Sequence, residues 1–159
     1  MNIYPFPPPK FNIELPAPQI TITLDTPSKG DFYALTAGTD PVKILSRYTD
    51  APLTGVTAAV LATRYIEQLK AYREANMDFM EVPHTIDFGD TGTKEDKLPC
   101  ITMAERMVYE HSGLTFLQQN ELPVTEFWML LADAVKFRLA GNDEYLEQCY
   151  KDMHKISDF

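Results

Sequence analysis

The chain has 159 residues, of which 45% are hydrophobic and 23% charged, and its formal net charge is −9. This composition is ordinary for one globular domain and argues against global disorder. Its basic residues form no cluster along the sequence. Nucleic acids and anionic membranes are therefore disfavoured as partners, because both are held by clustered positive charge.

Cysteine usage and the N-terminal segment bear on the compartment. Cys100 and Cys149 match no disulfide framework, and two reduced thiols fit a reducing cytoplasm. The opening MNIYPFPPPK lacks the basic and apolar segments of a signal peptide. No apolar run approaches the roughly 20 residues that span a bilayer. We therefore expect a protein of the cytoplasm.

The first third of the chain has the pattern of extended structure. The prolines of PFPPP, at 5–9, favour a polyproline arm. The stretches KFNIELP and PQITITLD alternate apolar and polar residues with period two, which predicts a β-hairpin that turns at the prolines between them. A third short strand is predicted in DFYALTAG, at 31–38.

Helical spacing begins further along the chain. Apolar residues recur every three or four positions over 54–74, which predicts one helix. Thr102 and Glu105 have the spacing of a capping box, which predicts the start of a second helix, and Gly113 predicts its end. A short helix is expected at 114–120.

The last part of the chain, from Pro123 to Ile156, has the pattern of two adjacent antiparallel helices joined by a Gly-Asn-Asp turn. The expected fold class is α+β, with an N-terminal β-hairpin or small antiparallel sheet followed by a bundle of four to five α-helices. Residues 1–53 should contain the Pro-rich arm and the hairpin. Residues 54–159 should form the helical domain, and the two parts are expected to make one folded unit.

No motif commits the chain to a reaction. The triplet Asp-Phe-Gly at 87–89, within a predicted loop at 77–99, matches the metal-binding triplet of kinases, but no glycine-rich loop or His-Arg-Asp sequence accompanies it. Its carboxylates are out of register for a calcium loop. His84, His111 and His154 lack the paired spacing of zinc ligands. We expect no catalytic residue, metal or cofactor, and a small enzyme is the least favoured alternative.

The C-terminal helix pair carries a wide apolar side, for which two interpretations stay open. It is either a plain hydrophobic core, the stronger interpretation for any single residue, or an oligomeric or client surface. Aromatic side chains are the usual anchors of such surfaces. The candidate interaction residues are Phe127, Trp128, Leu131, Phe137, Tyr145 and Tyr150.

The segment EFWMLLADAVKFRLAGNDEYLEQCYKDMHKI, within Leu122 to Ile156, resembles the helices of tail assembly chaperones of long-tailed, lambda-like bacteriophages, and TMAERMVYEHSGL is more weakly similar. The resemblance implies a non-enzymatic, self-associating protein of the host cytoplasm. Such a protein binds the tape measure protein, assists polymerisation of the major tail protein and is absent from the finished virion. Many members of the family also have a longer, frameshifted form. The alternative is a structural virion component, a head–tail connector or tail protein whose Pro-rich arm straps neighbouring subunits.

Overall fold

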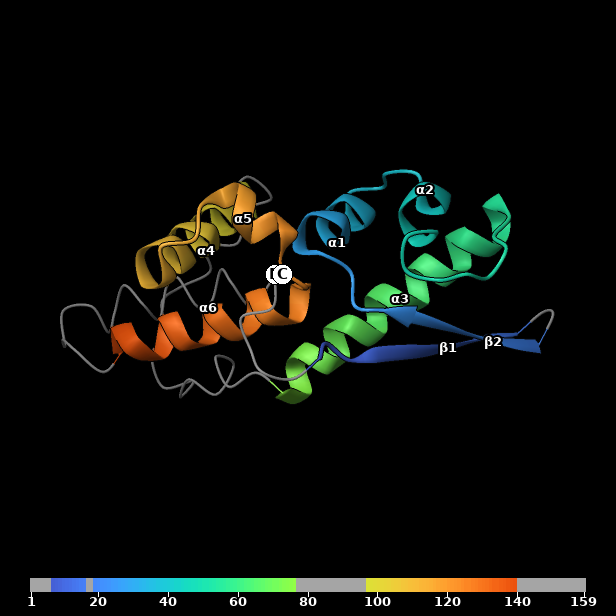
Figure 1. Ribbon diagram of the computed structural model, residues 1–159, viewed down its shortest axis with the longest axis horizontal. Helices are drawn as coiled ribbons and strands as arrows, with labels where there is room; N and C mark the ends of the chain where they lie inside the picture. The colour runs from blue at the N-terminus through green and yellow to red at the C-terminus, as the bar shows by residue number, and fades with distance from the viewer. Residues whose placement is uncertain (1–6, 17–18, 77–96, 140–159) are drawn as a thin grey trace. The chain divides into compact units, whose positions relative to one another are not determined.

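The computed structural model of the chain describes residues 7–16, 19–76 and 97–139, and for 97–103 and 135–139 it describes the backbone alone. The predicted fold class is confirmed, because a two-stranded antiparallel sheet is followed by helices (Figure 1). Six helices lie within the described ranges. The predicted second helix of the C-terminal pair lies outside the described residues, as does the predicted loop up to residue 96.

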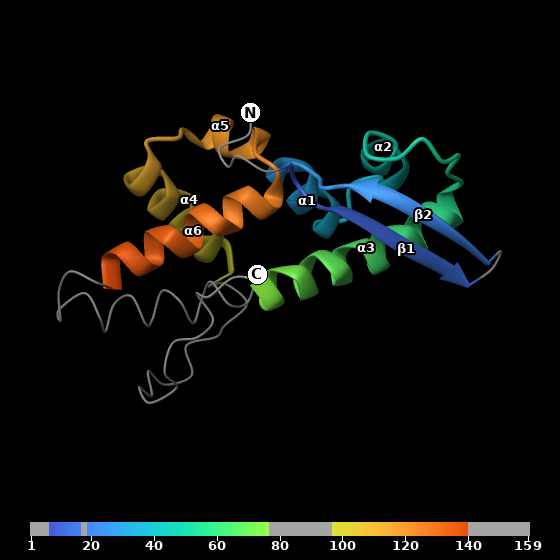
Figure 2. The same cartoon turned by 60° about the horizontal axis from the view of Figure 1, so that its bottom comes forward.

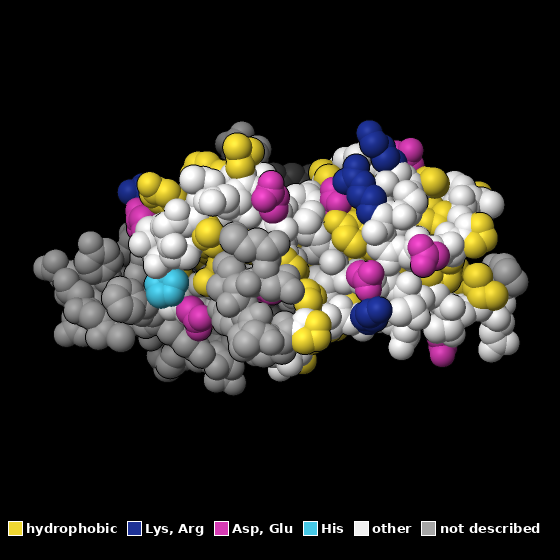
Figure 3. Space-filling model, in the orientation of Figure 1, with side chains coloured by type: hydrophobic (Ala, Val, Ile, Leu, Met, Phe, Trp, Pro, Cys, Tyr) yellow, Lys and Arg dark blue, Asp and Glu magenta, His cyan; other side chains and the backbone are white. Residues whose placement is uncertain are grey.

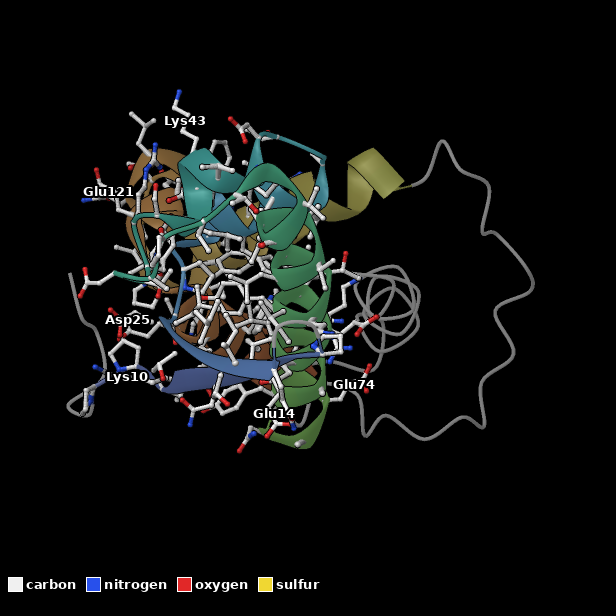
Figure 4. The ribbon with its side chains drawn as sticks, turned by 90° about the vertical axis from the view of Figure 1, so that its right-hand side faces the viewer. Lys10, Glu14, Asp25, Lys43, Glu74 and Glu121 are labelled. Carbon is white, nitrogen blue, oxygen red and sulfur yellow. The ribbon has the colours of Figure 1, made fainter. Side chains whose placement is uncertain are left out.

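The predicted hairpin is confirmed and consists of β1 (Lys10–Pro16) and β2 (Gln19–Asp25), paired antiparallel. In β1 the buried residues are apolar and alternate without exception with exposed residues. Lys10 lies opposite Asp25 in the ladder, and their charged groups are 3.5 Å apart. The labelled side chains of Lys10, Glu14 and Asp25 lie on the outside in Figure 4. One face of the hairpin therefore carries charge and the other closes a core.

That core is closed by α3 (Gly55–Asn76), which confirms the helix predicted over 54–74 and lies beneath the hairpin in Figure 2. Tyr65 of α3 meets the ring of Phe11 edge to face, with centroids 5.9 Å apart. The buried apolar residues of α3 recur at helical spacing, as expected for one side of an amphipathic helix: Ala58, Leu61, Ala62, Tyr65 and Leu69.

Two side chains of α3 also occupy the outer edge of β1. Arg64 Nη1 donates to the carbonyl oxygen of Glu14 at 3.0 Å, and Gln68 Nε2 donates to the carbonyl oxygen of Asn12 at 3.4 Å. Those carbonyls therefore point away from β2, because successive residues of an antiparallel ladder direct their backbone groups to opposite edges.

The stretch DFYALTAG is helical, so the prediction of a third strand there was wrong. Helix α1 (Lys29–Thr36) begins after the N-cap Ser28, whose Oγ accepts an amide hydrogen bond from the first turn at 3.1 Å. Phe32 and Leu35 are both buried. Residues three apart share one side of a helix but lie on opposite faces of a strand, which explains why the helix is favoured. Helix α2 (Pro41–Leu45) follows, with proline at its first turn.

Helix α4 (Lys97–Ser112) begins before the predicted start at Thr102, so that start was wrong. Pro99 lies in the first turn, where a proline removes no helical hydrogen bond, and the helix can therefore include it. Gly113 ends α4 with a φ of 76°, as predicted. The helices α5 (Phe116–Glu121) and α6 (Val124–Leu139) confirm the next two expected helices.

The described residues divide into two compact units. One contains the hairpin, α1, α2, α3 and Leu117–Phe127, and the other contains α4 and the remainder of α6. The hairpin and α3 belong to the same unit, because α3 packs on the hairpin.

Candidate functional site

The predicted interaction surface begins on α6, and its fully described side chains are buried. Phe127, Trp128 and Leu131 are 1%, 1% and 2% exposed, which agrees with the core interpretation for these three residues. The side chain of Phe137 and the residues Tyr145 and Tyr150 lie outside what the structure describes. Their part in partner binding stays a prediction, whereas binding at the three buried residues would require α6 to lose core contacts first.

A short antiparallel bridge fixes the start of α6 against the segment that leads into α1. The Lys29 amide donates to the Leu122 carbonyl at 2.7 Å, and the Val124 amide donates to the Pro27 carbonyl at 2.8 Å. These paired backbone bonds satisfy amides at the starts of two helices, which have no partner within their own helix. The bridge therefore sets where both helices begin.

Lys29 is a buried cation beside this bridge. Its Nζ donates to Asn120 Oδ1 at 2.9 Å and lies 5.0 Å from the ring centroid of Phe127 and 5.8 Å from that of Tyr33. A buried ammonium requires such partners, because it has lost its hydration. At Gly30 an added Cβ would lie 3.3 Å from the backbone oxygen of Asn120, so α1 and α5 approach closely here. We interpret this cluster as a structural contact that holds α1 against α5.

A polar cluster lies at the start of α1. The Tyr48 hydroxyl donates to the Asp31 carboxylate at 2.5 Å and accepts from the Ser28 amide at 3.1 Å. Arg47 Nη1 lies 2.8 and 3.0 Å from the two carboxylate oxygens of Asp31. Burial, followed by the hydrogen bond to Asp31, raises the pKa of Tyr48 above its ordinary value. The tyrosine therefore stays protonated at neutral pH, and the cluster anchors α1 without offering an activated base.

A second tyrosine hydroxyl is held inside the hairpin unit. Tyr65 is fully buried, and its hydroxyl donates to the backbone carbonyl of Asp25. Burial raises the pKa of Tyr65, and the charges of Tyr48 and Asp25 add to the shift. The bond joins α3 to the end of β2.

The described surface also carries an exposed aromatic pair, Tyr109 on α4 and Phe116 at the start of α5. Their side chains are 50% and 51% exposed, and the ring centroids are 6.4 Å apart. Leu117, next in the chain, is 78% exposed. Figure 3 shows hydrophobic side chains (yellow) reaching the surface over these helices. Aromatic side chains exposed in contact with each other are typical of protein-binding surfaces.

Metal-ligating residue types are dispersed in the described part of the chain. His111 is exposed near the end of α4. Within the residues that the structure describes, no group of three or more His, Cys, Asp or Glu is placed to hold a metal ion. The remaining candidates have no described side chain: His84, His154, Cys100, Cys149 and the Asp-Phe-Gly triplet at 87–89.

Comparisons of the chain with protein-family models, curated proteins and solved structures find no match. None of the helices in the described ranges combines the length and the apolar character needed to cross a membrane.

Proposed function

We propose that the chain is a tail assembly chaperone of a long-tailed bacteriophage, which self-associates and binds the tape measure protein in the host cytoplasm. Two features support the proposal. The first is the resemblance of Leu122 to Ile156 to that family, and α6 (Val124–Leu139) is the helix that carries the first half of it. The second is the exposed aromatic pair, which gives the chain an apolar surface for a client.

The exposed aromatic pair is the structural observation that supports client binding. A tape measure protein is long and rich in amphipathic helices, and such helices bind by placing their apolar side against an apolar surface. Many copies of a weakly binding chaperone along one client multiply the avidity. The net charge of −9 limits aggregation of the chaperone while that surface is exposed.

Co-expression with the tape measure protein tests the proposal. The wild-type chain should raise the soluble fraction of the client, and the double variant Tyr109→Ser with Phe116→Ser should not. The control is Val56→Ser with Val60→Ser, which removes two apolar side chains that are 80% and 41% exposed on α3. The proposal fails if wild type and both double variants leave the client equally soluble.

A structural virion component is the second candidate, and the hairpin favours it. A strand with an unpaired outer edge is a ready template for a strand of another subunit. In the part of the chain that the structure describes, no hydrogen bond uses the outward backbone groups of Thr21 and Thr23 on β2. The two candidate functions differ in whether the protein is present in the mature virion. Mass spectrometry of purified virions should find the structural component in stoichiometric amounts and should not find the chaperone.

A further inference from the structure

The backbone direction of β2 follows from its partner strand. The carbonyl groups of Asn12 and Glu14 point away from β2, because α3 side chains donate to them. The residues opposite them in the ladder are Thr23 and Thr21. In an antiparallel pair, opposite residues share the same direction, so the N–H and C=O groups of these threonines point away from β1. The amide of Asp25 obeys the same rule and donates outward.

The two edges of the hairpin differ in what occupies them. The β1 edge is covered by α3 side chains. Among the described residues, the β2 edge is closed only at Asp25, whose amide donates to the Tyr48 carbonyl at 3.0 Å. Within the described residues, no hydrogen bond uses the outward N–H or C=O of Thr21 or Thr23. Residues Gln19–Thr23 therefore form an open strand edge.

We propose that this edge pairs with the same edge of a second copy of the chain. The strands run antiparallel over Gln19–Thr23, with Thr21 opposite Thr21 of the partner subunit on the two-fold axis. In this register the outward residues face each other, and each aligned pair exchanges both of its N–H···O bonds. The register also leaves Asp25 of both copies outside the paired stretch, where Tyr48 closes the edge.

The side chains of the edge favour a second copy as the occupant. The sequence QITIT at 19–23 carries no charge, so two chains of net charge −9 can meet here without opposing like charges. Ile20 is 42% exposed, and this register places it beside Ile22 of the partner subunit on the same face of the sheet. Neighbouring threonine and isoleucine pairs are favourable across antiparallel strands.

The β2 edge would provide a surface for the self-association in the proposed function, and it is separate from the aromatic pair of Tyr109 and Phe116. Its test can therefore fail while client binding at the aromatic pair succeeds, and the reverse also holds. Pairing of this kind would join two hairpins into one continuous sheet, and sheets of more than two strands are more stable than an isolated hairpin.

A Thr21→Pro substitution can weaken the proposed interface without weakening the hairpin. The Thr21 amide points outward, so Thr21→Pro removes a donor from the proposed interface but none from the ladder with β1. Thr21→Ala is the matched control, because it shortens the side chain and keeps the amide. Thr21→Lys is a second variant that keeps the ladder and places like charges on the axis.

Sedimentation equilibrium over a range of protein concentrations measures the association, with circular dichroism to confirm the fold of each variant. Wild type and Thr21→Ala should dimerise alike, and Thr21→Pro and Thr21→Lys should each weaken association by about tenfold or more. Hydrogen exchange at the Thr21 and Thr23 amides should slow as the wild-type concentration rises. A monomeric wild type at all concentrations would overturn the inference. So would a folded Thr21→Lys variant that associates like wild type.

Discussion

The hydroxyl of Tyr65 provides a direct test of how α3 holds the hairpin. The side chain is fully buried, its ring packs against Phe11, and its hydroxyl donates to the Asp25 carbonyl. Tyr65→Phe keeps the ring and removes this donor. Because an unsatisfied buried polar group costs about 1–3 kcal/mol, we expect the free energy of unfolding to fall by about 1.5 kcal/mol.

Urea unfolding followed by far-UV circular dichroism measures this change. In a chain of this size the same loss should lower Tm by about 3–6 °C. The matched control is Tyr109→Phe, which removes a hydroxyl from a side chain that is 50% exposed. The control should change stability by less than about 0.5 kcal/mol. The reasoning is refuted if the two variants unfold at the same urea concentration with equal slopes.

The same tyrosine predicts a dependence on pH. Burial holds the pKa of Tyr65 above its ordinary value, which is about 10 in an unfolded chain. The unfolded chain therefore releases this proton first, so the contribution is fully present below about pH 10 and is lost as the pH rises further. Tyr65→Phe should lose stability less steeply than wild type above about pH 10. Parallel profiles for the two proteins would contradict the burial of an un-ionised hydroxyl.

Three further substitutions test the remaining contacts. Tyr48→Phe, which removes the hydroxyl bonded to the Asp31 carboxylate, should lower the free energy of unfolding by about 1–2 kcal/mol in urea titrations. Gly30→Ala should be less stable than Gly55→Ala by about 1 kcal/mol in thermal unfolding, because a Cβ at Gly30 meets a backbone oxygen at 3.3 Å and one at Gly55 meets open space. Trp128→Ala should lower the free energy of unfolding by about 3–5 kcal/mol, because the side chain is 1% exposed. A loss below about 1 kcal/mol would contradict this burial.

Local sequence patterns predicted most of the secondary structure. The hairpin follows from strict alternation, and α3 follows from apolar spacing over 54–74. The failures came where short patterns are ambiguous. The stretch at 31–38 is apolar enough for a strand, and the features that favour a helix are the N-cap at Ser28 and the three-residue spacing of Phe32 and Leu35. Thr102 and Glu105 have the spacing of a cap, but α4 had already begun.

The candidate sites were harder to predict because they depend on tertiary contacts. Spacing on α6 identified an apolar stripe, but it carries no information on what covers Phe127 and Trp128. A buried lysine is unusual in any sequence, and the partner of Lys29 on α5 is distant along the chain. The exposed pair of Tyr109 and Phe116 spans two helices, so no single periodicity indicates it.

The open edge of β2 illustrates a further limit. Alternation within QITITLD predicts a strand, but the strand order and the direction of its amides come from the pairing with β1. The residues that occupy the opposite edge belong to α3 and are not adjacent in sequence. An edge strand can therefore be distinguished from a central strand only once the fold is known.

We propose that this chain keeps a long helical tail protein from aggregating through the exposed aromatic pair of Tyr109 and Phe116. Light scattering of purified tape measure protein, diluted from denaturant with increasing amounts of the purified chain, measures this activity most directly. Scattering should fall in proportion to added wild-type chain and stay high with the Tyr109→Ser, Phe116→Ser variant. Equal scattering with and without the wild-type chain would contradict the proposed chaperone activity.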